Sequence, residues 1–177
     1  ILEDLSGISP GLVEEAVREF RFPAHRLQEL EVPGMGRVID DSKSTCFQAT
    51  RAAVEMVEGR VHLIMGGLDK GQDPSELTRC FVQRNPRIYL FGAAGKKMQQ
   101  AWQDSVDVCV CEDSLEGVMN VLFSTRTTSA EPVLFSPGCS SFDQFTGFAE
   151  RGDHFQNLFR RMAEEHPLQH DFNPGTL

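Results

Sequence analysis

Apolar runs of strand length alternate with segments of helical period along most of this 177-residue chain. Buried parallel strands produce such short apolar runs, and the helices between them produce the longer amphipathic segments. The alternation therefore predicts a Rossmann-like α/β fold: an open, mostly parallel sheet with helices on both faces. The expected strands are 37–40, 61–65, 87–91, 106–110 and 132–135, and the expected helices are 45–57, 74–84, 96–104, 114–123 and 148–164.

The two ends of the chain read differently. Proline at an early position predicts a short helix at 10–20, Pro23 breaks it, and 27–32 alternates like an additional edge strand. After Glu165 the sequence is polar and interrupted by proline, so we expect residues 166–177 to be a disordered tail. The chain opens on Ile1 without a methionine, which suggests a piece of a longer protein.

Charge and cysteine content exclude several classes of protein. The net charge of −9 disfavours binding to nucleic acid or to an anionic membrane surface, since both need a basic face. The five cysteines form no C-x-x-C pair, so neither a disulfide framework nor a zinc site is indicated. No apolar run approaches the ~20 residues of a membrane span. A reduced, cytoplasmic setting is expected.

Polar, mostly glycine-rich stretches follow four of the expected strands and precede helices: "DDSKST", "GGLDKGQD", "FGAAGKK" and "SPGCSSFDQF". In an open parallel sheet these positions share the edge at the carboxyl ends of the strands, where ligands of such folds bind. We therefore expect the four loops to form one crevice.

The crevice lacks the glycine patterns of common nucleotide sites, since neither G-x-x-x-x-G-K-[ST] nor G-x-G-x-x-G occurs in these loops. It does contain Lys43 and Lys70 with several hydroxyls, among them Thr45 and Ser141. Cations and hydroxyls beside helix starts form a receptor for carboxylates or phosphates, such as an acidic amino acid or a nucleotide. The alternative is that these residues only cap helices and face solvent.

Two adjacent acids begin the first loop. Consecutive residues leaving a strand point in opposite directions, so Asp40 and Asp41 are not expected to act as one acid/base pair. We interpret Asp40 as a loop or helix cap. Asp41 is expected to turn toward the crevice, where its carboxylate could accept hydrogen bonds from a ribose.

Other conspicuous residues carry less weight. Arg151, Gly152 and Asp153 spell an adhesion tripeptide that arises often by chance, and here it lies in an amphipathic helix. His62 lies inside an expected strand and is interpreted as a hydrogen-bonded core residue. Cys139 is interpreted as a bystander thiol.

The loops also form a recognisable set. "PAHR", "DDSKST", "GGLDKGQD" and "SPGCSSFDQF" followed by "GFAERGDHF" resemble, in order and spacing, the carboxyl-terminal domain of Mur ligases, most closely the D-glutamate-adding kind. The resemblance covers about residues 23–165 and implies that 1–22 are the end of a preceding, central ATPase domain and its linker.

The resemblance implies an ATP-dependent amide synthesis in bacterial cell-wall assembly. ATP phosphorylates the carboxylate of UDP-N-acetylmuramoyl-L-alanine, and the amine of D-glutamate attacks the resulting acyl phosphate. The main sites for ATP and Mg²⁺ are expected in the central domain, so the fragment alone should bind neither and be inactive. The alternatives are a stand-alone binding module for an anionic metabolite, or a Mur ligase that adds another amino acid.

Site roles follow from the resemblance motif by motif. Arg26 resembles the arginine that reaches the nucleotide, and Asp41 the acid on its ribose side. Lys43 resembles the lysine placed near the phosphoryl and glutamate groups, where positive charge stabilises the transition state. Lys70 resembles the lysine that binds a glutamate carboxylate. The rest of the expected amino-acid pocket is Thr45, Ser141, Phe142 and Phe148, and no metal ligand is expected.

The first motif departs from the family pattern at three positions. The family more often reads N-D-S-K-A-T-N, whereas this chain has Asp40, Ser44 and Cys46 at the first, fifth and last of these places. The lysine and threonine are retained. The motifs of diaminopimelate-adding ligases and of folylpolyglutamate synthases are absent, so glutamate is preferred over a diamino acid.

Overall fold

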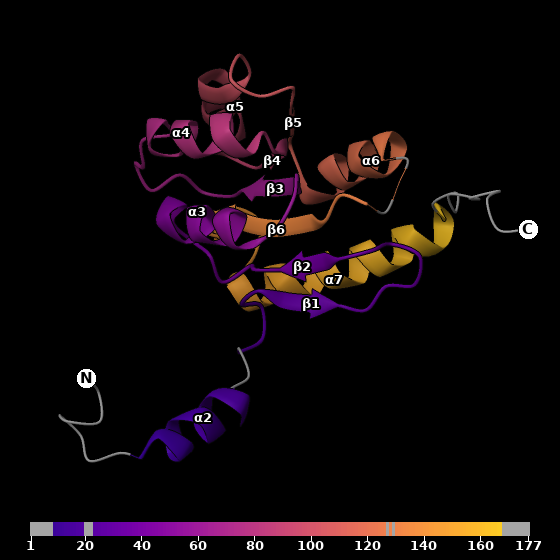
Figure 1. The fold of residues 1–177 in the computed structure, drawn as a ribbon. Coiled ribbons are helices and arrows are strands. Elements are labelled where there is room, and N and C mark those ends of the chain that lie inside the picture. Colours follow the sequence, from indigo (N-terminus) through magenta and orange to yellow (C-terminus); the bar gives the residue numbers. More distant parts are fainter. Residues whose placement is uncertain (1–8, 20–22, 127, 129, 168–177) are drawn as a thin grey trace, which may run out of the picture.

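The computed structural model describes residues 9–19, 23–126, 128 and 130–167. Its centre is a six-stranded sheet with the order β1-β2-β6-β3-β4-β5 (Figure 1). Strand β1 pairs antiparallel with β2, and every other pair is parallel. The predicted open, mostly parallel sheet is confirmed. The strands are β1 (Gln28–Leu30), β2 (Val38–Asp40), β3 (His62–Gly66), β4 (Arg87–Phe91), β5 (Val108–Glu112) and β6 (Val133–Gly138).

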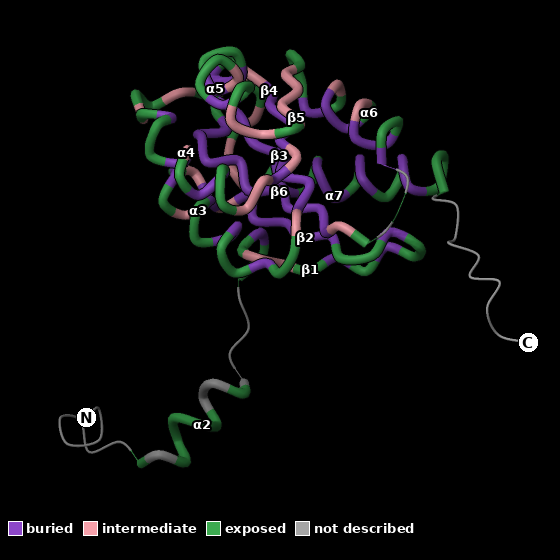
Figure 2. Tube along the Cα trace, turned by 45° about the horizontal axis from the view of Figure 1, so that its top comes forward, coloured by how far each residue is buried: buried purple, intermediate pink, exposed green. Residues whose placement is uncertain are grey.

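Helices cover both faces of this sheet, as the sequence predicted. Alternate strand residues face opposite sides, so Leu63 and Leu90 belong to one buried cluster while Ile64 and Phe91 belong to the other. The first face carries α3 (Phe47–Met56), α4 (Ser75–Arg84) and α5 (Gly95–Trp102), and the second carries α6 (Leu115–Thr125) and α7 (Phe148–Glu165). Figure 2 shows the inner strands β2, β6, β3 and β4 buried between these two layers, and the edge strand β5 more exposed.

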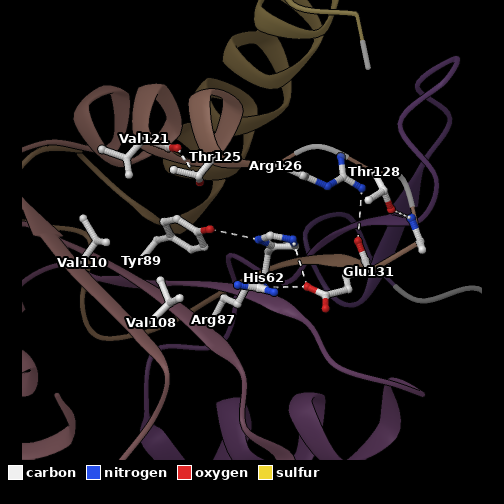
Figure 3. Close-up of a pocket in the computed structure, with 11 residues that line it drawn as sticks. His62, Arg87, Tyr89, Val108, Val110, Val121, Thr125, Arg126, Thr128 and Glu131 are labelled. Atoms are coloured by element: carbon white, nitrogen blue, oxygen red, sulfur yellow. Dashed lines mark hydrogen bonds and ion pairs between the residues drawn. The ribbon is translucent and has the colours of Figure 1, made fainter. Parts of the chain in front are cut away.

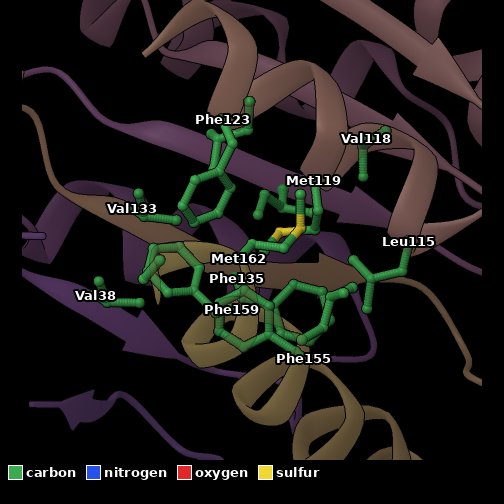
Figure 4. Packing of buried hydrophobic residues seen from close by; sticks show 14 of the residues in the cluster. Val38, Leu115, Val118, Met119, Phe123, Val133, Phe135, Phe155, Phe159 and Met162 are labelled. Atoms are coloured by element: carbon green, nitrogen blue, oxygen red, sulfur yellow. The ribbon is translucent and has the colours of Figure 1, made fainter. Parts of the chain in front are cut away.

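Aromatic side chains fill both layers. On the first face Trp102 lies edge-on to Phe81, with ring centroids 4.8 Å apart, and its indole nitrogen donates to the carbonyl of Pro74. On the second face Phe135 of β6 stacks on Phe155 of α7 at 4.3 Å (Figure 4). Ring pairs of this kind add to the free energy gained by burying apolar area. They attach the start of α7 firmly to the centre of the sheet.

The largest differences from the predicted element boundaries are at β6, which ends three residues later than expected, and at β5, which starts two residues later. Asp107 is held in a turn because its amide donates to Asn85 Oδ1. Helix α2 (Pro10–Glu19) agrees with the predicted first helix and lies apart from the sheet in Figure 1. Residues 1–8, 20–22 and 168–177 lie outside the described residues, so the domain division and the disordered tail stay predictions.

The chain changes faces between two neighbouring strands at the centre of the sheet. The loop after β3 leads to α4 on the first face, whereas the loop after β6 leads to α7 on the second. Such a switch point opens a crevice outside the carboxyl ends of the two strands. Gly66 and Gly138 are paired there, beside a register shift in the ladder.

Gly66 and Gly67 leave no room for a side chain at this edge, because a Cβ added at either would lie 2.1 Å from a main-chain oxygen. The φ of Gly66 is 146°, and the oxygen that its Cβ would meet is that of Phe91. We therefore expect Gly66→Ala to lower the free energy of unfolding by roughly 2–4 kcal/mol, because the clashing atom is backbone and cannot turn aside.

Urea denaturation of the 177-residue chain measures this effect. Gly147→Ala is the matched control, since Gly147 has an extended backbone and no atom within 4 Å of its added Cβ. Equal stability of the two variants would contradict the prediction.

Candidate functional site

The four polar loops meet at the carboxyl edge of the sheet, as the sequence predicted. The amide of Gly138 donates to the carbonyl of Ser44 at 2.9 Å, which joins the loops after β6 and β2. Leu68 and Ser140 exchange main-chain hydrogen bonds, which join the loops after β3 and β6. The amide of Ala94, after β4, donates to the carbonyl of Gly67 at 2.9 Å. We call this four-loop edge the crevice.

Lys43 and Phe148 come together in the crevice although they are far apart in sequence. The ammonium nitrogen of Lys43 lies 5.3 Å from the centroid of the Phe148 ring, within the range of a cation–π contact. The amide of Lys43 donates to the carbonyl of His25, and Ser42 Oγ donates to the carbonyl of Phe148 at 2.8 Å. The backbone on both sides of Lys43 is therefore fixed, while its side chain stays half-buried.

Asp41 lies beneath the first loop rather than on its surface. One carboxylate oxygen accepts from Ser44 Oγ at 2.5 Å and from Ser136 Oγ at 2.8 Å, and the other accepts from the amide of Leu27. Burial raises the pKa of Asp41 above its usual value, although these hydrogen bonds oppose the shift. In this arrangement Asp41 holds its own loop together, and its predicted contact with a ribose stays a prediction.

Asp40 has a separate set of partners. Its buried carboxylate accepts from the Ser42 amide at 2.9 Å and from Gln156 Nε2 at 2.7 Å, and it lies 2.7 Å from His25 Nδ1. The interpretation of Asp40 as a loop cap is confirmed, and so is the expectation that the two acids do not act as a pair. The sequence did not reveal the link to α7 through Gln156.

The remaining predicted site residues lie on or beside the same loops. Lys70 and Arg26 are exposed, and Phe142 is 69% exposed. Ser141 is buried at the start of the turn after β6, where its carbonyl accepts from the amide of Phe145. Thr45 is half-buried just before α3. The structure thus brings the loops of all these residues to one edge, and their roles toward a ligand stay predictions.

The main residue that sequence reasoning missed is Arg151, in the first turns of α7. Its side chain is fully buried and donates hydrogen bonds to oxygen atoms of Ser42 and Cys139. The tripeptide that contains it is therefore no exposed adhesion signal. The missed indication was its spacing, because position 151 falls on the apolar stripe formed by Phe148, Phe155 and Phe159.

A cavity of about 410 Å³ opens at the same edge, one strand further along the sheet. It lies between the loops after β4 and β6 and is lined by Lys96 together with Glu112, Asp113 and Asp143. One cation against three carboxylates makes this cavity unsuitable for an anion. This cavity is therefore not the predicted anion receptor, whose location at the neighbouring loops of Lys43 and Lys70 stays a prediction.

A second cavity, of about 360 Å³, lies at the opposite, amino-terminal edge of the sheet (Figure 3). His62 Nδ1 lies 3.0 Å from the hydroxyl of Tyr89, while Glu131 accepts from Arg87 Nε at 2.8 Å and lies 3.3 Å from His62 Nε2. These groups bind one another, so the interpretation of His62 as a hydrogen-bonded core residue is confirmed. Burial lowers the pKa of His62 to about 4.

All five cysteines are free thiols. Cys139 is buried beneath the loop after β6, and burial raises its pKa to about 12, so no thiolate forms at neutral pH. Its burial agrees with the interpretation of Cys139 as a bystander, which stays a prediction.

No helix within the described residues is long and apolar enough to cross a membrane. In that same part of the chain, no three histidine, cysteine or acidic side chains gather where they could hold a metal ion.

The chain is similar to curated relatives named UDP-N-acetylmuramoylalanine--D-glutamate ligase. The relative from Acidobacterium capsulatum is 34% identical over 154 residues, which is 87% of this chain and 33% of that protein. Seven further relatives, at 31% to 35% identity, have the same name. The chain therefore spans about a third of the length of the curated relatives it matches. A scan against protein-family models found no match.

Two solved structures share the fold. MurF from Acinetobacter baumannii has a TM-score of 0.63 at 15% identity, over 89% of this chain and 34% of that one. A bifunctional folylpolyglutamate synthase/dihydrofolate synthase with Mn, AMPPNP and L-glutamate bound has a TM-score of 0.56 at 15% identity. The match covers 86% of this chain and 35% of that chain. At these identities the likeness supports the fold alone. The curated relatives confirm the resemblance to D-glutamate-adding Mur ligases.

The burial of His62 predicts a pH-dependent stability. Its pKa is about 4 in the folded chain against an ordinary value of 6.5, so only the unfolded chain takes up this proton between these values. The free energy of unfolding should therefore fall, by up to about 3 kcal/mol from this group, as the pH drops from 6.5 to 4.

Urea denaturation at several pH values, compared with His62→Gln, measures this contribution. The variant should lose less stability over that pH range than the parent chain. Parallel pH profiles for the two proteins, or a His62 pKa above 6 by NMR titration, would contradict the prediction.

Proposed function

We propose that this chain is the amino-acid-binding domain of a ligase that joins D-glutamate to UDP-N-acetylmuramoyl-L-alanine in the bacterial cytoplasm. The observation that carries the proposal is the meeting of the loops of Lys43, Lys70 and Ser141 at one sheet edge, in a chain similar over nearly all its length to such ligases. The cytoplasmic setting fits five free cysteines.

In the proposed reaction the terminal phosphoryl group of ATP moves to the carboxylate of the UDP-linked substrate and ADP leaves. The amine of D-glutamate then attacks the acyl phosphate and phosphate departs. In this proposal the chain supplies positioning and charge rather than a covalent step. Lys70, Thr45, Ser141, Phe142 and Phe148 would hold D-glutamate, and Lys43 would stabilise the negative charge that develops during transfer.

For the nucleotide, the residues present fit a limited role. Arg26 is exposed next to His25, whose carbonyl is bonded to the Lys43 amide, so an arginine and a lysine stand close in the structure. The guanidinium of Arg26 could contact a phosphate from there. Asp41 could reach a ribose only if its bonds to Ser44 and Ser136 opened. We assign the main ATP and Mg²⁺ sites to other parts of the ligase.

The rival hypothesis is a stand-alone binding module for an anionic metabolite, and a second is a ligase that adds another amino acid. Both predict binding at Lys43 and Lys70. Only the ligase hypothesis predicts ADP formation that depends on an amino acid, and only the D-glutamate version predicts preference for that enantiomer.

The 177-residue chain alone should form no ADP when given ATP, UDP-N-acetylmuramoyl-L-alanine and D-glutamate, since the proposed triphosphate site lies elsewhere in the ligase. A coupled ADP assay measures this, and the complete ligase is the positive control. Clear turnover by the pure chain would refute the assignment of the ATP site.

In the complete ligase, Lys70→Ala should raise KM for D-glutamate at least 10-fold and change KM for ATP less than 3-fold, because one charge-assisted hydrogen bond to a carboxylate is lost. Steady-state kinetics measure both values. Lys96→Ala is the matched control, because it removes the same charge from an exposed position in the first turn of α5. Equal increases in KM for D-glutamate and in KM for ATP would show that Lys70 is not part of the glutamate site.

A further inference from the structure

We propose that Arg151 is the positioning residue of the crevice: its buried guanidinium fixes the three loops that carry Lys43, Lys70 and Ser141. The effect on glutamate binding rests on the proposed function, whereas the effect on the loops does not. Arg151 itself is not expected to touch a ligand, because it is fully buried beneath the loops.

The contacts of Arg151 reach all three loops. Its NH2 group donates to the carbonyl of Ser42 at 2.8 Å and its Nε to Ser42 Oγ at 3.1 Å. Its NH1 group donates to the carbonyl of Cys139 at 3.0 Å and, at 3.5 Å, to that of Gly66. Ser42 directly precedes Lys43, Cys139 precedes Ser141 by two residues, and Gly66 ends the strand before the loop of Lys70. Lys43, Lys70 and Ser141 thus each lie within four residues of an atom that Arg151 binds.

Arg151 lies between the carboxyl ends of two neighbouring central strands, β6 and β3. It lies on α7, which follows β6, and it reaches back to Gly66 at the end of β3. These two strands flank the switch point, at which the loops diverge toward opposite faces. Main-chain hydrogen bonds between Leu68 and Ser140 join these two loops. Arg151 adds a side chain that binds carbonyls on both sides, and we expect it to fix the spacing of the loops at their base.

The electrostatics of Arg151 are unusual for a buried cation. Within the described residues no carboxylate lies within ion-pair distance of it, and its partners are main-chain carbonyls and one hydroxyl. Burial lowers the pKa of Arg151 to about 10, so it stays protonated at neutral pH. The loops are therefore held by a buried positive charge that has no direct ion-pair partner, although the charges of Asp143 and Asp40 act on it from a longer distance.

The geometry requires an arginine rather than any cation. The planar guanidinium donates in three directions at once, toward Ser42, Cys139 and Gly66, whereas a lysine ammonium is a compact point charge on a flexible stem. The packing leaves little room for adjustment, since a Cβ added at Gly67 would lie 3.1 Å from Arg151 NH1. Arg151→Lys therefore keeps the charge and removes the three-way attachment.

Gly152 and Asp153, which follow Arg151 in α7, support the loop of Lys43 through His25. A Cβ added at Gly152 would lie 2.1 Å from His25 Nδ1, so the absence of a side chain there lets His25 approach the helix. Asp153 Oδ1 lies 3.6 Å from the other ring nitrogen of His25. The carbonyl of His25 in turn accepts from the amide of Lys43. One turn of α7 thus contacts both Ser42 and the segment that holds Lys43.

Hydrogen exchange of the 177-residue chain tests the loop attachment without any substrate. In Arg151→Lys, the hydrogen-bonded amides of Lys43, Leu68 and Ser140 should exchange at least 10-fold faster, while amides of β4 keep their rates. Arg160→Lys is the matched control, because it makes the same substitution at an exposed position of α7. Unchanged exchange at these three amides would overturn the proposal.

Kinetics of the complete ligase test the consequence. Arg151→Lys should raise KM for D-glutamate at least 10-fold and KM for ATP less than 3-fold, while Arg160→Lys leaves both unchanged. A wild-type KM for D-glutamate in Arg151→Lys overturns the proposal and leaves the proposed function intact. If the wild-type ligase forms no ADP in response to D-glutamate, the proposed function fails. The hydrogen-exchange experiment then decides by itself whether Arg151 holds the loops.

Ser42→Ala keeps the test decisive if Arg151→Lys does not fold. It removes the hydroxyl that accepts from Arg151 Nε and donates to the carbonyl of Phe148, and it keeps the carbonyl that accepts from NH2. It should raise KM for D-glutamate about 2- to 5-fold and speed exchange at Lys43. The wild-type value for both measurements would overturn the proposal.

Discussion

The hydrogen bonds from the buried Arg151 guanidinium to carbonyl groups of three loops are the constraint on which this edge of the sheet depends. A parallel sheet leaves the carboxyl ends of its strands without a fixed arrangement, because each strand continues into its own loop. Here α7 is attached to the sheet by the stack of Phe155 on Phe135, so the position of Arg151 is set by the core. The packing of the core therefore also restrains the loops, because Arg151 connects α7 to them.

The two acids at the end of β2 complete this support from below. Asp40 accepts from Gln156 of α7, and Asp41 accepts from Ser136 of β6, so each carboxylate ties the first loop to a different element. The family pattern has an amide where this chain has Asp40. A carboxylate at that position accepts hydrogen bonds only, which matches a Gln156 amide and a Ser42 amide, both donors. The departure is thus accommodated by its neighbours and does not require an altered fold.

Periodicity alone predicted the fold class, the order of strands and helices and the loops that form the crevice, because burial on both faces imposes continuous apolar strands. It placed β5 two residues early, since the turn held by Asn85 depends on a contact 22 residues away in sequence. It also missed Arg151, because a charged residue on an apolar stripe is usually read as solvent-facing. Only the three-dimensional meeting of Ser42, Gly66 and Cys139 explains why an arginine lies there.

A chain with a net charge of −9 can still offer a site for a doubly negative amino acid, because only nearby charges matter. Exposed carboxylates farther than a Debye length of about 8 Å are largely screened at physiological ionic strength. The charge of Arg151 is buried just below the crevice and is screened much less. The carboxylates of Asp40 and Asp41, in the first loop, accept internal hydrogen bonds, and burial raises the pKa of Asp41. The proposed anion site therefore depends on Arg151 together with Lys43 and Lys70 on the loops above it, and not on the overall charge.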